Sequence, residues 1–177
     1  SRIESVEGER KDDPLDPVDL LSHICDELMA AWPGRQIELV TSSKLCVLGN
    51  AAELRSAISN LIVNALKYSE APVSVRWSDT VVGPELLVED QGPGIDPKHI
   101  PRLTERFYRV DKSRSQATGG TGLGLAIVKH VAVSHDARLF IDSELEKGST
   151  FRLVFPNDRA VSCDVCSTEC GRTDASQ

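Results

Sequence analysis

Residues 119–129 read Gly-Gly-Thr-Gly-Leu-Gly-Leu-Ala-Ile-Val-Lys, a glycine-rich turn that runs directly into an amphipathic helix. Glycine lets the backbone approach a ligand closely and adopt positive φ angles, and the first turn of a helix offers unpaired N–H groups at the positive end of its dipole. These features predict an anion-binding site. The same turn alone is equally consistent with a tight connection, so residues elsewhere in the chain must discriminate between the two interpretations.

Size and charge limit the class of protein. The chain has 177 residues, of which 40% are hydrophobic and 27% charged, as expected for one globular domain with a single core. No apolar run approaches the roughly 20 residues that span a bilayer, so we expect this part to be soluble. The net charge of −7 argues against nucleic acid or anionic lipid as partners, because both require clustered Lys and Arg.

Composition divides the chain into three segments. Residues 1–14 are charged and contain proline, which predicts a linker or the end of a preceding helix. Residues 15–157 hold the periodic apolar pattern of a folded domain. Residues 158–177 are a polar tail, expected to be disordered, with three cysteines at Cys163, Cys166 and Cys170. Their spacing is close to that of a metal site, but three thiols without a histidine favour the disordered tail.

The spacing of apolar residues predicts an α/β domain. Helices are predicted from residue 17 to about 32, over 51–68 and over 123–133, with a short helical segment around 97–106. Strands are predicted over 37–40, 45–48, 73–77, 85–90, 138–142 and 149–155. Asp16 and Asn50 are the expected N-caps of the first two helices. Residues 109–120 have almost no apolar anchor, which predicts a mobile loop.

Two asparagines, Asn60 and Asn64, lie four residues apart and therefore on one face of the 51–68 helix. Asparagine is unfavourable inside helices, so the pair needs a reason other than helix propensity. An amide oxygen can complete the ligand shell of Mg²⁺, which binds few protein oxygens in addition to phosphates. Lys67, one turn further on, is placed to reach a phosphate. The alternative is that both asparagines simply face solvent.

Residues 90–95 read Asp-Gln-Gly-Pro-Gly-Ile, an acid at the end of a strand followed by two glycines that open the wall of a pocket. A buried carboxylate there needs hydrogen-bond donors, and the exocyclic amine of adenine is one. A simple β-turn would also explain the motif. Its position between the asparagine pair and residues 120–125 makes a chance occurrence improbable.

These motifs, in this order, resemble the ATP-binding domain of histidine kinases, within the GHKL superfamily that includes gyrase, mismatch-repair and heat-shock chaperone ATPases. The resemblance covers about residues 16–156. It implies a two-layer α/β sandwich of the Bergerat type, in which a mixed sheet packs on a layer of helices and a mobile lid covers ATP. Residues 50–68 and 105–128 are most similar to phosphate-regulon sensor kinases.

The resemblance implies a role for each matching residue. Asn64 is the implied Mg²⁺ ligand, Tyr68 packs on adenine, and Asp90 binds the adenine amine. The residues implied to bind ATP are Asn60, Asn64, Lys67, Tyr68, Asp90, Gly92, Gly94, Ile95, Tyr108, Lys112, Arg114, Gly120, Thr121, Gly122, Leu123, Gly124, Leu125 and Thr150. Those implied to act in catalysis are Asn60, Asn64, Lys67 and Arg109. For the basic residues near 109–114, a solvated flexible loop is the alternative.

One position separates kinase from hydrolase. The ATPases of the superfamily carry a glutamate one turn before the metal-binding asparagine, and here that residue is Asn60, which cannot accept a proton at neutral pH. Transfer to a histidine nitrogen needs chiefly an aligned γ-phosphate, since the nucleophile already has a lone pair. The sequence therefore favours a protein histidine kinase. A degenerate nucleotide-sensing or partner-docking module and an autonomous ATPase remain as alternatives.

The phosphoacceptor histidine of such kinases is followed by an acid and then by a proline, and His23, His99, His130 and His135 all lack that context. We expect His23 and His130 on helix surfaces or in packing, and His99 and His135 in solvent. The expected partners are therefore an upstream dimerisation domain of the same protein, which carries the acceptor, and a response regulator. The whole protein is expected at the inner membrane, with this part in the cytoplasm.

Overall fold

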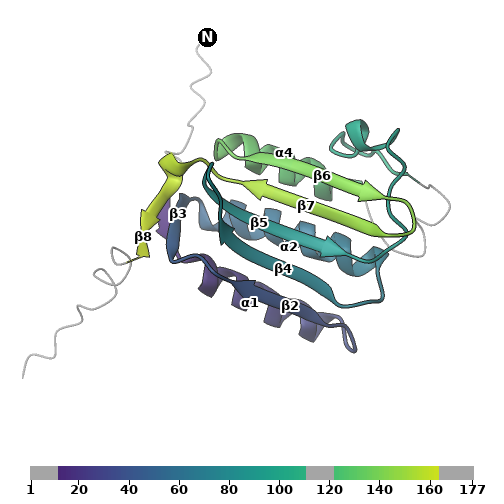
Figure 1. The fold of residues 1–177 in the computed structure, drawn as a ribbon, viewed down its shortest axis with the longest axis horizontal. Coiled ribbons are helices and arrows are strands. Elements are labelled where there is room, and N and C mark those ends of the chain that lie inside the picture. The colour runs from purple at the N-terminus through teal and green to yellow at the C-terminus, as the bar shows by residue number, and fades with distance from the viewer. Residues whose placement is uncertain (1–11, 111–121, 164–177) are drawn as a thin grey trace, which may run out of the picture.

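The computed structural model describes residues 12–110 and 122–163, in which a layer of helices packs on a five-stranded sheet (Figure 1). The helices are α1 Pro17–Ala31, α2 Ala51–Tyr68 and α4 Gly124–Ser134, with 3₁₀ turns η1 Ile100–Arg102 and η2 Asn157–Arg159. The strands are β1 Asp13–Leu15, β2 Ile37–Thr41, β3 Leu45–Gly49, β4 Val73–Asp79, β5 Pro84–Asp90, β6 Arg138–Glu144, β7 Gly148–Val154 and β8 Ala160–Ser162. None of the helices in the two described ranges has the length and apolar character needed to cross a bilayer.

The large sheet has the strand order β2-β4-β5-β7-β6. The β2–β4 pair is parallel and the other pairs are antiparallel, so the sheet is mixed. Val75, Val88 and Phe151 lie opposite one another on adjacent strands and are buried, because this face of the sheet is covered by the helices. The predicted two-layer α/β sandwich is confirmed. Most of the expected lid, residues 111–121, lies outside the described residues.

Helix α2 is the central element of the helix layer. The Asn50 side chain accepts a hydrogen bond from the Glu53 N–H at 3.0 Å and so caps the helix, as predicted. One face of the helix is fully buried, through Leu54, Ala57, Ile58, Leu61, Ile62, Ala65 and Leu66. Each fully buried leucine or isoleucine stabilises the fold by about 1.5–3 kcal/mol, so this face holds α2 firmly against the sheet.

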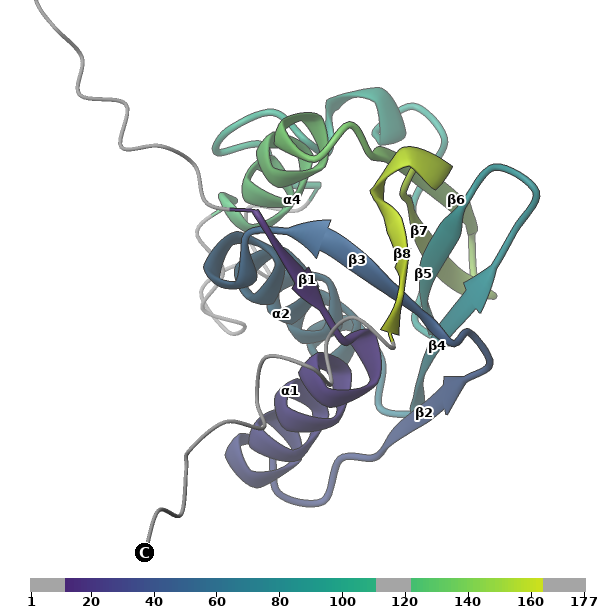
Figure 2. The same ribbon diagram turned by 90° about the vertical axis from the view of Figure 1, so that its left-hand side faces the viewer.

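A second, three-stranded sheet with the order β1-β3-β8 closes one end of the sandwich (Figure 2). The sequence did not predict it, because β1 and β8 are too short for an apolar period to be visible. They extend the ordered domain beyond the expected limits of residues 15 and 157. The predicted strand β3 pairs with them and not with β2. The expectations for residues 1–11 and 164–177, including Cys166 and Cys170, lie outside the described residues.

The guanidinium of Arg159 joins three segments at this end of the molecule. It donates to Asp12 at 2.9 Å, to the Leu48 carbonyl at 3.2 Å and to Asp136 at 3.1 Å. Asp12 precedes β1, Leu48 lies in β3, and Asp136 follows α4. One half-buried side chain therefore fastens the start of the described chain, the small sheet and the end of α4 together.

His135 is not solvated, as we expected from the sequence, but is completely buried at 0% exposure. Its Nε2 accepts a hydrogen bond from the Asn50 N–H at 3.0 Å, and its Nδ1 lies 2.8 Å from the Val131 carbonyl. Because a backbone N–H can only donate, the proton of the neutral ring is on Nδ1. The ring links the end of α4 to the start of α2, a contact between residues far apart in sequence that no local pattern reveals.

Replacing His135 with alanine should lower the free energy of unfolding by about 2–4 kcal/mol, since it removes a buried ring and leaves the Asn50 N–H without its acceptor. Urea unfolding measures the change. The matched control is His130→Ala on the exposed side of α4, which should shift the same quantity by less than about 0.5 kcal/mol. Equal effects of the two variants would contradict this account of His135.

Candidate functional site

The predicted motifs converge at the end of the sandwich opposite the small sheet (Figure 1). There β5 ends at Asp90, β6 ends at Glu144 and β7 begins at Gly148. The last turns of α2 and the chain entering α4 lie at the same end. The site is therefore built from connections held by rigid elements on both layers.

Asp90 is the buried acid of the site, with 4% of its surface exposed. Its Oδ1 accepts a hydrogen bond from the Gly92 N–H at 2.9 Å, and the Ser149 N–H also donates to the carboxylate. Burial raises the pKa of Asp90 above its ordinary value, and the two N–H donors only partly oppose this. Such a carboxylate can accept a hydrogen bond from a ligand amine.

Backbone segments approach one another closely beside Asp90. A Cβ atom at Gly92 would lie 2.3 Å from the Tyr68 carbonyl oxygen, so only glycine fits there. Gly94 lies in the same way against the Glu144 backbone. Ile95 is half-buried, and its N–H donates to Ser143 Oγ at 2.7 Å. The structure thus brings the glycine motif of residues 90–95 directly against the last turn of α2.

Asn60 lies where α2 meets the first turn of α4. Its Nδ2 donates to the Ser56 carbonyl at 2.8 Å, and its Oδ1 would be 3.0 Å from a Cβ at Gly124. Asn64 and Lys67 follow on the next turns and are half-buried. Tyr68, at the end of the helix, is 50% exposed. The asparagine pair on α2 and the glycine-rich turn that leads into α4 are therefore adjacent in space. The hypothesis of a shared site requires this.

The entry into α4 is suited to an anion. The Gly122 carbonyl accepts a hydrogen bond from the Phe107 N–H at 2.9 Å, and Gly122 has a positive φ of 73°. Leu123 occupies the N-cap position, where its apolar side chain cannot accept hydrogen bonds from the first-turn N–H groups. Among the described residues no N-cap side chain bonds to those N–H groups, which suits them to a ligand phosphate. Leu125 packs partly against the core. The predicted ligands Lys112, Arg114, Gly120 and Thr121 lie outside the described residues.

Tyr108 is held by η1 and its flanking residues. Its hydroxyl is hydrogen-bonded to His99 Nδ1, and the Arg102 guanidinium lies 4.4 Å from the centre of its ring. His99 is thus half-buried and hydrogen-bonded, contrary to the expectation that it is solvated.

Phe107, which precedes Tyr108, is 70% exposed and adopts a left-handed φ of 65°, a strained conformation for a side chain of this size. Arg109 is half-buried, and its Cγ would lie 3.2 Å from a Cβ at Gly122.

Thr150 is not part of this site. It lies opposite Glu89 and Asp142 on the face of the sheet that the helices leave uncovered. Ser149 is the buried neighbour that shares a face with Asp90, and its hydroxyl contacts Ser143 Oγ at 2.8 Å. Ser149 is not among the site residues predicted from the sequence, although its alternation with the inward-facing Phe151 indicates that it faces inward as well.

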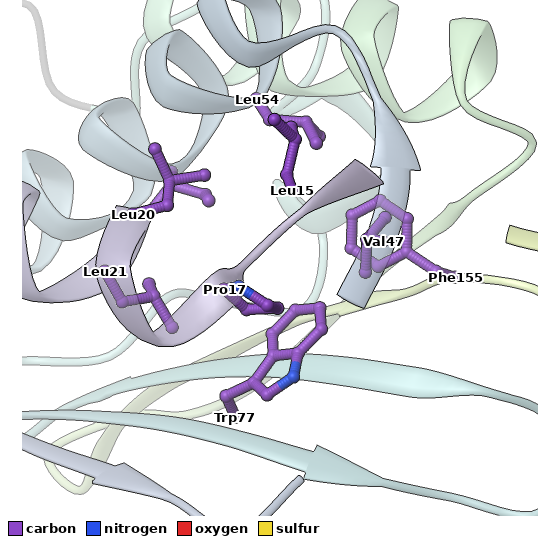
Figure 3. A pocket seen from close by; sticks show the side chains of 9 residues that line it. Leu15, Pro17, Leu20, Leu21, Val47, Leu54, Trp77 and Phe155 are labelled. Atoms are coloured by element: carbon purple, nitrogen blue, oxygen red, sulfur yellow. The ribbon is translucent and has the colours of Figure 1, made fainter. Parts of the chain in front are cut away.

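A small apolar pocket at the other end of the molecule is not a candidate site (Figure 3). Its walls come from α1, α2, the small sheet and the large sheet, and consist of Leu15, Pro17, Leu20, Leu21, Val47, Leu54, Ile58, Trp77 and Phe155. No charged or hydroxyl side chain lines it, so it offers nothing to bind a phosphate. In the part of the chain that the structure describes, no three His, Cys, Asp or Glu side chains are grouped to hold a metal ion.

Residues 49–159 match a family model described as histidine kinase-, DNA gyrase B- and HSP90-like ATPase. The chain belongs to this family. It is 48% identical over 159 residues to the phosphate regulon sensor protein PhoR of Pseudomonas aeruginosa, across 88% of this chain and 36% of that protein. The resemblance inferred from the sequence motifs, including the similarity to phosphate-regulon kinases, is confirmed.

Solved structures of family members share the fold. The mycobacterial sensor histidine kinase MprB has a TM-score of 0.72 and 30% identity, over 82% of this chain and 97% of that chain. Full-length ShkA in complex with AMPPNP has a TM-score of 0.71 and 31% identity, over 84% of this chain and 31% of that chain. The chain spans about a third of the length of the curated relatives, which at 36% and 30% coverage contain further segments.

Replacing Asp90 with asparagine should stabilise the ligand-free domain at pH 7. An acid whose pKa is raised by folding favours the folded state below its unfolded pKa of about 3.9, and that contribution is lost as the pH rises through the raised value. The stability gained by Asp90→Asn should therefore be present at pH 7 and disappear towards pH 4. Urea unfolding at both pH values tests this, with Glu89→Gln on the exposed face as the control. A loss of stability at pH 7 would contradict the prediction.

Proposed function

We propose that this chain is the catalytic ATP-binding domain of a sensor histidine kinase, which transfers the γ-phosphate of ATP to a histidine on a separate dimerisation domain. The observation that carries the proposal is the convergence of a buried acid, two amides and an uncapped helix start at one end of the sandwich. Each part suits a different portion of the nucleotide. Family membership supports the assignment, since the relatives named above are sensor kinases.

Asp90 is the proposed base-recognition residue. Its carboxylate already accepts two backbone N–H bonds, and its buried position favours a further donor such as the exocyclic amine of adenine. Guanine presents a carbonyl oxygen at the equivalent position, which a carboxylate repels. Tyr68 and Ile95 border the same space and are assigned to the faces of the base. The AMPPNP complex of the related ShkA supports an adenine nucleotide as the ligand.

The proposed phosphate site lies between α2 and the start of α4. Asn60, Asn64 and Lys67 provide two amides and one cation, and α4 provides first-turn N–H groups. A neutral amide suits Mg²⁺, which in nucleotide sites is held mainly by phosphate oxygens and water and only secondarily by protein. Asn64 is the residue assigned to it. The ion would supply neutralisation of the phosphate charge, while Lys67 and the helix dipole orient the chain of phosphates.

The contacts of the Asn60 side chain favour phosphoryl transfer to a histidine over ATP hydrolysis. Its Nδ2 is engaged with the Ser56 carbonyl and its oxygen faces Gly124, so it has no group that can take a proton from water. A histidine nucleophile attacks with its own lone pair, and a P–N bond forms as the P–O bond to ADP breaks. Arg109, beside Gly122, is assigned to the charge that develops during this step. The phosphoryl group then passes to an aspartate of a response regulator.

The proposal is tested by mixing the purified chain and Mg-ATP with the upstream dimerisation segment of the same protein. Phosphate that is labile in acid and stable in alkali should appear on that segment. Tight nucleotide binding without transfer would instead favour a nucleotide-sensing module. Sustained phosphate release without the segment would favour an autonomous ATPase. Titration calorimetry that detects no adenine nucleotide binding would refute all three.

In the same assay, Asn64→Ala should lower the transfer rate by more than about 100-fold, because it removes the protein ligand of the metal. The matched control is Asn157→Ala, an asparagine at the other end of the molecule whose side chain bonds only to the Val81 carbonyl among the described residues. The control should transfer at the wild-type rate. Normal activity of Asn64→Ala would refute the assigned metal ligand.

A further inference from the structure

Arg35 lies in the turn between α1 and β2, far in sequence from the motifs of the site, and its guanidinium reaches the end of α2. Nη1 donates to the Leu66 carbonyl at 2.6 Å, and Nη2 donates to the Ser69 carbonyl. The last carbonyls of a helix have no partner within the helix and carry the negative end of its dipole. A cation with two forked donors is well suited to bind them.

The two carbonyls flank the residues assigned to the nucleotide. Leu66 and Ser69 enclose Lys67 and Tyr68, so one guanidinium holds both ends of the segment from which these two side chains project. These two bonds join the backbone of this turn to the connection between α1 and β2. The Arg35 bonds therefore help to fix the backbone from which the side chains of Lys67 and Tyr68 project.

The same turn supports the base site. The Tyr68 carbonyl is the group that approaches Gly92 so closely that a Cβ there would lie 2.3 Å away. Gly92 in turn donates its N–H to Asp90 at 2.9 Å. Because the two backbone segments lie this close, a shift of the turn towards Gly92 would displace Gly92 and disturb the carboxylate. Arg35 is thus linked through Tyr68 and Gly92 to Asp90.

Arg35 stabilises the end of α2 through these two bonds, but its own burial has a cost. Within the described ranges, Arg35 Nε and the neighbouring Ser69 Oγ are buried without a hydrogen-bond partner. In the same part of the chain no carboxylate forms an ion pair with Arg35. Partial burial of a cation without a counter-ion is unfavourable, and an uncharged residue would avoid this cost. Arginine alone supplies two donor nitrogens in one rigid plane, which can bind the Leu66 and Ser69 carbonyls together.

We propose that Arg35 is a positioning residue for nucleotide binding, which holds residues 66–69 so that Lys67 meets the phosphates and the Gly92–Asp90 base site remains formed. The inference rests on the proposed nucleotide-binding function. Arg35 itself does not touch the nucleotide. Its loss should weaken affinity more than it slows transfer once the site is filled.

Calorimetric titration with ADP tests the proposal, at a temperature well below the unfolding midpoint of every protein compared. Arg35→Gln should raise the Kd for ADP about tenfold, and Arg35→Lys, which keeps the charge but loses the fork, should give an intermediate value. Arg55→Gln is the matched control, because Arg55 also joins α2 to α1, through Glu27, but at a distance from the site. It should bind ADP within about twofold of wild type. In the transfer assay, Arg35→Gln should recover most of its rate at saturating ATP.

A folded Arg35→Gln protein with the wild-type Kd would overturn the inference and leave the proposed function intact. Failure of the wild-type chain to bind ADP would instead refute the proposed function. If Arg35→Gln does not fold, Arg35→Lys decides the matter in the same titration, and a wild-type Kd for that variant would likewise overturn the inference. An equal loss of affinity in Arg55→Gln would show that any loosening of α2 suffices, and would also contradict a specific role for Arg35.

Discussion

The whole structure depends on the way α2 packs against the sheet. Seven side chains on one face of this helix are buried, and the same helix carries Asn60, Asn64 and Lys67 on another face. A rotation of α2 about its axis would expose leucine and isoleucine and bury amides without partners, which is unfavourable on both counts. The hydrophobic core therefore determines where the polar residues of the site point. The orientation of the polar side chains on α2 is therefore only as well defined as the packing of its buried face.

Two groups at the site oppose stability. Asp90 is a carboxylate in a buried position, and Phe107 adopts a left-handed backbone conformation while most of its side chain is exposed. Neither arrangement would persist in isolation, since burial of charge and a strained backbone each raise the free energy of the folded state. The surrounding elements hold them in place. Clusters of this kind are typical of sites arranged for a ligand, whose binding supplies the missing partners.

The sequence predicted the elements with a long apolar period well, because one buried face imposes the pattern along their whole length. Helix α2 has the predicted limits, residues 51–68, and the Asn50 cap. The failures have a different cause. β1 and β8 are three residues each and are stabilised by pairing with β3, and His135 is buried by a partner 85 positions away, so tertiary contacts outweigh local sequence.

For the candidate site as well, local motifs indicated some residues, whereas tertiary contacts place others. Motifs indicated Asp90, Asn60 and the start of α4 as parts of the proposed site, because turns and helix faces are local features. Motif matching favoured Thr150, whereas the register of β7 places Ser149 beside Asp90. Arg35 belongs to no motif, since its role arises only when the α1–β2 turn meets the end of α2. Supporting residues of this kind are visible only in three dimensions.

The first and last described strands, β1 and β8, both pair with β3, and Arg159 ties Asp12 to this small sheet and to Asp136. This attachment lies at the end of the sandwich remote from Asp90 (Figure 1). Mechanical load applied between Asp12 and Cys163 would consequently be borne first by β3 and by the arginine bridge. The five-stranded sheet and the candidate site around Asp90 would be shielded from tension transmitted along the polypeptide.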